Sequence, residues 1–355
     1  MKKILKYDSI IVFFIFASLM ILPAFCRNLY VGDELWTFSN TYKMYNGYEI
    51  YKDCNVIATP VFFYIGELLF FIFSPNMLVF RFYNVLINSL LYFGIYELNK
   101  LFGISKRKSL LYTLALIIFE NILNYYGANY NNLVYVFVIC GIIFNIKQKN
   151  NVLKGLILFL IFMTKQNVGV YYFVGICLYY LWDKNNLKKN IKSLIIQGTI
   201  AFICFGIYCL YLYCNGTLVY FYDMAFCSIS EFSVKNLKFA GETICVFLIQ
   251  LMTLIFALFS VLSKKVNLSS DIKNNIKLIL CISMPLCAVE YPLFNNAHLV
   301  YGAFFCMVCL FLIMDKLIIS DFVIKNKVIN ISIISIIIFL SCISVFNNVL
   351  GYILR

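Results

Sequence analysis

The chain has 355 residues, of which 63% are hydrophobic and only 13% are charged. A soluble domain is about 45–50% apolar and about 25% charged, so this composition excludes an ordinary water-soluble fold and requires the bilayer as part of the solvent. The net charge of +13 does not indicate nucleic-acid binding, because the basic residues lie in short clusters between apolar runs, as in the cytoplasmic loops of membrane proteins.

The first apolar run, 9–26, follows Lys2, Lys3 and Lys6 and imitates a secretion signal. It lacks a small-residue cleavage pattern, and Phe25 before Cys26 does not suit a lipoprotein site. We therefore expect an uncleaved first membrane span, with the N-terminus in the cytoplasm.

Further apolar runs follow, but 60–73, 152–164 and 167–182 are shorter than the roughly 17–25 residues that cross a bilayer alone. If 60–73 lies on the outer surface and the other two form a hairpin of short crossings, 21 of the 29 basic residues face the cytoplasm, as the positive-inside rule favours. The sequence thus predicts an all-α, multipass cell-membrane protein of about 11 spans, a single domain over 1–355 without a separate soluble domain. The predicted runs are 9–26, 60–73, 77–98, 109–125, 131–146, 152–164, 167–182, 193–214, 240–262, 275–292, 298–315 and 328–347.

In this topology the outer segment 27–76 is much longer than the other outer segments, and such loops often carry function. Asp33 and Glu34 follow the first span, where partial desolvation can raise the pKa of a carboxyl and prepare it to accept a proton. Thr59 is a natural N-cap and Pro60 fits the first helical position. We therefore expect short juxtamembrane helices in this segment, one of which begins at that point.

Several short motifs follow one another along the chain, and together they resemble the GT-C superfamily of membrane glycosyltransferases. This superfamily includes protein O-mannosyltransferases and bacterial enzymes that move sugars, such as aminoarabinose, from polyprenyl phosphate to lipid A or other surface acceptors. The motifs are Gly32-Asp33-Glu34, Tyr51-x-Asp53, Thr59-Pro60-x-x-x-Tyr64, Arg81, the aromatic and Asn-rich stretch Tyr125 to Asn132, Thr164-Lys165-Gln166, and Tyr291-Pro292 followed by His298.

The resemblance implies an inverting transfer of a sugar from a polyprenyl-phosphate donor on the extracytoplasmic face. The acceptor would be a glycan, a lipid or a protein, with membrane lipid around the site. By this resemblance Asp33 is the expected general base and Glu34 a supporting acid. An acceptor hydroxyl must lose its proton as it attacks the anomeric carbon, and a positioned carboxylate can take that proton, which contributes about 10²–10⁴-fold.

The leaving group is a lipid phosphate, which needs positive charge more than it needs a proton. Lys165 suits this role because a charge that interrupts an apolar stretch is costly and usually functional. Arg81 is the second candidate cation, and His298, the single histidine in the sequence, is a further candidate for binding phosphate or hydroxyl.

Three further residues of the motifs complete the expected substrate-binding set: Asp53, Tyr64 and Asn131. We expect no dedicated metal site, although the carboxylates of Asp33, Glu34 and Asp53 leave open whether a divalent cation takes part.

The sequence also departs from the family. Asn131 and Asn132 stand where relatives often carry an acid, Thr59 stands where some carry a basic residue, and the segment 293–296 lacks the Arg and Asp found in others. Donor-phosphate binding can therefore differ in this chain. A transporter or lipid flippase is the alternative function, although no inverted repeat is visible and the polar residues gather at one face and not at the midplane.

Overall fold

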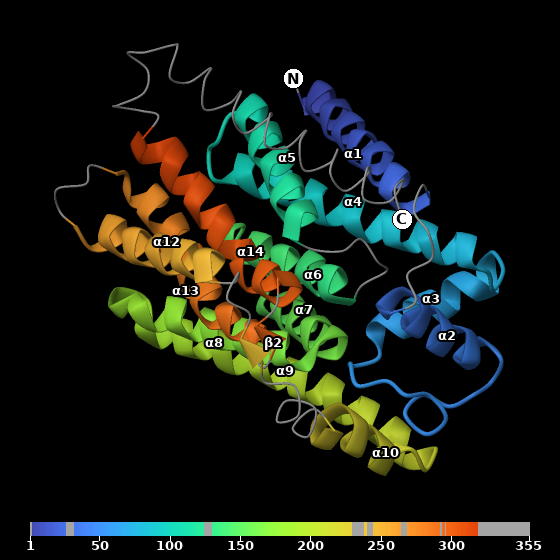
Figure 1. Ribbon diagram of the computed structural model, residues 1–355. Helices are drawn as coiled ribbons and strands as arrows, with labels where there is room; N and C mark the ends of the chain where they lie inside the picture. Colours follow the sequence, from blue (N-terminus) through green and yellow to red (C-terminus); the bar gives the residue numbers. More distant parts are fainter. Residues whose placement is uncertain are drawn as a thin grey trace. The chain divides into compact units, whose positions relative to one another are not determined.

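The computed structural model describes residues 2–25, 32–123, 130–228, 238–239, 244–263, 268–291, 293–294 and 296–318. Nearly all of these residues are helical, which confirms the predicted all-α class (Figure 1). Two short strands, β1 (Lys238–Phe239) and β2 (Leu293–Phe294), pair in parallel. The helices are α1 (Lys2–Phe25), α2 (Asp33–Tyr45), α3 (Val61–Ile72), α4 (Met77–Leu101), α5 (Lys106–Leu123), α6 (Tyr130–Ile146), α7 (Asn151–Thr164), α8 (Gln166–Trp182), η1 (Lys184–Asn186), α9 (Leu187–Cys214), α10 (Leu218–Tyr222), η2 (Asp223–Cys227), α12 (Ile244–Leu262), α13 (Ser270–Leu286), η4 (Cys287–Glu290), α14 (Asn296–Ile313) and η5 (Met314–Ile318).

Every predicted apolar run up to residue 315 coincides with a helix in the part of the chain that the structure describes, whereas the run 328–347 lies outside it. Three of the described helical stretches are long and apolar enough to cross a membrane, namely 77–101, 184–214 and 270–290. Together with the composition, these stretches indicate a membrane protein.

The chain forms two compact units. The first comprises 1–94, 126–173 and 180–237, and the second comprises 95–125, 174–179 and 238–355. In the first unit α7 packs against α6 and α9, and α2 packs against α3. In the second unit α14 packs against α12, α13 and α5. The prediction of a single functional domain stays a prediction.

The segment between α1 and α4 contains two short helices, α2 and α3, which confirms the prediction of short helices there. The predicted cap, however, is wrong. Pro60 is the N-cap residue of α3, and the Thr59 hydroxyl donates instead to the backbone carbonyl of Phe162 in α7, at 2.8 Å. This long-range hydrogen bond fastens the start of α3 to α7.

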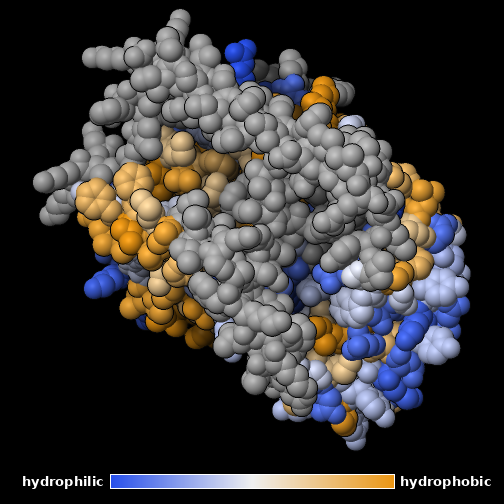
Figure 2. Space-filling model, in the orientation of Figure 1, coloured by the Kyte–Doolittle hydropathy of each residue, from blue (hydrophilic) through white to orange (hydrophobic). Residues whose placement is uncertain are grey.

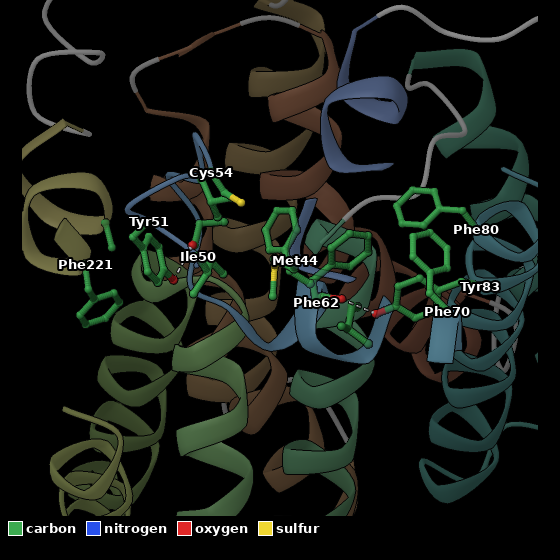
Figure 3. Close-up of a cluster of buried hydrophobic side chains, with 14 of the residues drawn as sticks. Met44, Ile50, Tyr51, Cys54, Phe62, Phe70, Phe80, Tyr83 and Phe221 are labelled. Atoms are coloured by element: carbon green, nitrogen blue, oxygen red, sulfur yellow. Dashed lines mark hydrogen bonds between the residues drawn. The ribbon is translucent and has the colours of Figure 1, made fainter. Parts of the chain in front are cut away.

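A buried aromatic cluster joins α2, α3, α4 and the loop 46–60 within the first unit (Figure 3). Phe62 and Phe63 at the start of α3 are fully buried in it. Tyr51 and Tyr83 donate their hydroxyls to the carbonyls of Ala58 and Phe62, each at 3.1 Å. Because these buried hydroxyls have partners, the hydrogen bonds offset the cost of removing them from water, one within the loop and one between α4 and α3.

The surface of the first unit is divided between polar and apolar regions. Figure 2 shows hydrophilic residues gathered over α2 and the loop that follows it. By contrast, α9 exposes large apolar side chains such as Phe202 and Ile207. An apolar helix face of this kind fits contact with lipid, because water would oppose its exposure.

Candidate functional site

Asp33 and Glu34 occupy the first turn of α2, where the free backbone N–H groups and the helix dipole favour acidic side chains. The two carboxylates nevertheless lie in different environments. Asp33 keeps exposed surface, whereas Glu34 is fully buried. Of this pair, only Asp33 can therefore meet a molecule that arrives from solvent.

Glu34 is paired with Arg81 of α4, whose Nε lies 3.1 Å from Oε1 of the carboxylate. The Arg81 side chain is 13% exposed, so the pair is largely removed from water. A buried pair of this kind is strongly coupled, because removing one partner leaves the other charge uncompensated. The ion pair therefore links α2 to α4 and gives both residues a structural role in addition to the predicted functional one.

Lys165 is the single residue between α7 and α8, in extended backbone conformation. Its Nζ donates to Oδ1 of Asn131 at 2.5 Å and lies 5.7 Å from the ring centre of Tyr130. An amide oxygen and an aromatic face both favour a cation. Two predicted binding residues, Lys165 and Asn131, are thus in direct contact.

Asp33 lies within electrostatic range of Lys165. Burial raises the pKa of the Asp33 carboxyl, and the positive charge of Lys165 lowers it in part. Burial lowers the pKa of Lys165 to about 8, and the negative charge of Asp33 opposes that change. The result is an accessible carboxylate with raised proton affinity, in electrostatic range of a cation whose pKa is about 8.

The tip of the α7–α8 hairpin is tied to the outer segment by Gln166, which follows Lys165. Its buried Nε2 donates to the carbonyl of Ala225 at 2.7 Å and to that of Ile57 at 3.2 Å. Both Gln166 and Thr59 fix the loop before α3 to this hairpin, which holds Lys165 in place. The sequence placed Gln166 in the motif Thr164-Lys165-Gln166 but gave it no role.

Two aromatic residues near the pair were not among the predicted site residues. Trp36 lies one turn after Asp33, and its ring centre is 6.3 Å from that of Tyr130. The indole Nε1 of Trp36 donates to the carbonyl of Asn55 at 2.9 Å, which fixes the ring. Tyr130 could have been predicted as a site residue, because it directly precedes Asn131 in the Asn-rich motif. Trp36 could not, because it lies near Asp33 only when 33–45 forms a helix.

Asp53 and Tyr64 are held by other contacts of the first unit, and His298 belongs to the second unit. Oδ2 of Asp53 accepts the backbone N–H of Glu49 at 2.9 Å and closes an exposed turn. The Tyr64 hydroxyl lies 3.4 Å from that of Tyr208 in α9. His298 is a partly buried residue of α14 in the second unit. Tyr125 to Asn129 and Pro292 of the predicted motifs lie outside the described residues.

The acids considered for a divalent cation are not arranged as a ligand set, because Glu34 is paired with Arg81 and Asp53 closes its own turn. Within the described ranges, no three His, Cys, Asp or Glu side chains are grouped as a metal site would require. Comparison of the chain with protein-family models, curated proteins and solved structures gives no match.

Proposed function

We propose that this chain is a membrane glycosyltransferase that moves a sugar from a polyprenyl-phosphate donor to an acceptor at the outer membrane face. One observation carries the proposal: the exposed carboxylate of Asp33 and the partly buried cation Lys165 lie close enough to interact electrostatically. Transfer of a sugar from a phosphate needs a base for the acceptor and a positive charge for the departing phosphate. These two groups supply both.

In the proposed reaction, Asp33 takes the proton of an acceptor hydroxyl while the hydroxyl oxygen forms a bond to the anomeric carbon. The bond between that carbon and the donor phosphate breaks, and the phosphate leaves with the electron pair. Lys165 stabilises the negative charge that gathers on this phosphate. A single displacement of this kind inverts the anomeric configuration.

The neighbouring residues take supporting parts. Asn131 orients the Lys165 ammonium by accepting its hydrogen bond at 2.5 Å. Glu34 and Arg81 hold the first turn of α2 against α4, so that Asp33 is presented from a fixed backbone. Such positioning of reacting groups accounts for a large part of catalysis in general.

In the proposed topology the chain crosses the membrane about 11 times, with the N-terminus in the cytoplasm and with Asp33 and Lys165 on the outer side. The positive-inside pattern supports it, since this arrangement leaves 21 of 29 basic residues inside. The hydrophilic surface over α2 and its following loop fits an aqueous face.

Incubation of the purified protein with a panel of polyprenyl-phosphate sugars tests the proposal. We expect loss of at least one donor, and we expect Asp33→Asn to stop that loss. A panel in which no donor is consumed above the level of a protein-free control, with protein that is folded and monodisperse, would contradict the function.

A further inference from the structure

A second lysine lies buried at the opposite end of α7 from Lys165. Lys154 is only 7% exposed, so its ammonium does not reach out to water as lysines near a membrane boundary usually do. It stands 11 residues before Lys165, which corresponds to about 16 Å along a helix axis. The two cations therefore belong to separate sites.

The Lys154 ammonium is held by an oriented chain of neutral groups. Its Nζ donates to the Tyr180 hydroxyl at 3.0 Å, and that hydroxyl donates in turn to Oδ1 of Asn145 at 2.7 Å. The Asn145 amide donates to the carbonyl of Gly141 at 2.9 Å. These residues come from α7, α8 and α6, so three helices converge on the ammonium.

The charge of Lys154 is not balanced by this network. Across the described part of the chain, no carboxylate is paired with Lys154, and Tyr180 is its one hydrogen-bond acceptor. An ammonium has three N–H donors, and an unbalanced buried charge is expensive, so a residue of this kind is a functional-site candidate. The Tyr180 ring, whose centre lies 5.8 Å from Nζ, adds a weak attraction, and an anion would also satisfy the remaining N–H donors and the charge.

The surroundings point to an anion that carries phosphate. Asn151 accepts from the Ser193 hydroxyl at 2.7 Å, which places the start of α9 beside the start of α7. The first turns of both helices lack acidic residues, so their dipoles favour an anion at this end, where Asn150 caps α7 by accepting the Val152 N–H at 2.9 Å and Asp183 precedes η1. The exposed lysines of the same end are Lys147, Lys149, Lys184, Lys188, Lys189 and Lys192.

We infer that this end of the first unit binds a phosphate group, with Lys154 as its buried anchor and the exposed lysines as its rim. The phosphate can come from the headgroup of an anionic phospholipid or from a soluble phosphate. The inference does not depend on the proposed transferase activity, because it uses no residue of the Asp33–Lys165 site.

Native mass spectrometry of the purified full-length protein in detergent tests the inference, with phosphatidylglycerol as the probe and phosphatidylcholine as the neutral lipid. We expect the wild-type protein to retain phosphatidylglycerol selectively, and Lys154→Met to weaken this retention at least about tenfold. Lys154→Arg keeps the charge and should retain the lipid better than Lys154→Met. Lys52→Met, at an exposed lysine of the loop 46–60 outside the proposed site, is the control and should change retention little.

A second arm separates the two sources of phosphate. The melting temperature is measured in inorganic phosphate and in chloride of equal ionic strength, for the wild type and for Lys154→Gln, which replaces the ammonium with a neutral amide. A stabilisation by phosphate that needs Lys154, without selective retention of phosphatidylglycerol, supports the site and assigns it to a soluble anion. If folded Lys154→Met and Lys154→Gln match the wild type in both arms, the inference is overturned.

Discussion

Asp33 and Lys165 interact electrostatically, although one stands in the first turn of α2 and the other links α7 to α8. The surrounding hydrogen bonds explain how residues so distant in sequence meet. Thr59 bonds to Phe162 and Gln166 bonds to Ile57, so the outer segment is fastened to the hairpin on both sides of Lys165. The pair is thus a product of tertiary contacts.

Asp33→Asn removes the proposed proton acceptor and keeps the size of the side chain. We expect the rate of sugar transfer to fall at least about 10²-fold, since general base catalysis contributes about 10²–10⁴-fold. Transfer of a radiolabelled sugar from a polyprenyl-phosphate donor measures the effect, and an unchanged melting temperature verifies the fold.

The matched control is Glu49→Gln, which neutralises an exposed carboxylate of the same segment. Glu49 forms a surface ion pair with Lys52 at 3.5 Å, and such exposed pairs contribute little to stability. This variant should keep its activity. If Asp33→Asn turns over donor as fast as the wild type, Asp33 is not the base.

The activity should depend on the protonation of Lys165. Burial lowers the pKa of Lys165 to about 8, so the charged fraction falls from near complete at pH 6 to about one tenth at pH 9. Because the proton-bearing form stabilises the leaving phosphate, kcat/KM should decline as the pH rises through about 8. At low pH the Asp33 carboxyl gains a proton and can no longer act as a base, so kcat/KM should also fall there. Because the pKa of Asp33 is raised, this fall begins at a higher pH than for an ordinary aspartate.

Lys165→Arg provides the control for this pH profile, because a guanidinium stays protonated throughout the range. Its alkaline limb should be flat up to pH 9, whatever its absolute rate. A limb near pH 8 that persists in the arginine variant would assign the titration to another group.

The sequence and the structure agree where an isolated polar residue interrupts an apolar run, because such a residue is visible without tertiary information. Lys165 is of this kind, and it contacts Asn131, which was expected from the Asn-rich motif. The helix α2 could not be recognised in the same way, since it has no apolar run and its anchors, Glu34 to Arg81 and Trp36 to Asn55, lie far away in sequence.

The buried ion pair of Glu34 and Arg81 should stabilise the first unit. Arg81→Met leaves the fully buried Glu34 without the cation, and we expect a destabilisation of about 3–5 kcal/mol. The double variant Glu34→Gln with Arg81→Met removes both charges and should recover part of this loss. Denaturant or thermal unfolding in detergent measures both variants, and additive losses would show that the two charges are not coupled.

The topology can be tested with accessibility tags in intact cells. A tag at Asn46, which ends α2, should report the outer side. A tag at Ser230, which lies outside the described residues, should report the same side because the positive-inside pattern places the 215–239 loop there. Opposite results at the two positions would require a different number of crossings between them.

The close approach of α7 and α9 should depend on Gly155. A Cβ at this position would lie 2.7 Å from Cβ of Ile200 and 2.9 Å from the carbonyl oxygen of Gln197, closer than real contacts allow. We expect Gly155→Ala to destabilise the protein by about 1–3 kcal/mol, as overpacking in a filled interior usually does. Gly206→Ala in α9 is the control, because nothing lies within 4 Å of a Cβ there and alanine favours a helix. Melting temperatures of the two variants compare them directly, and equal values would mean that α7 and α9 are farther apart at Gly155 than these contacts indicate.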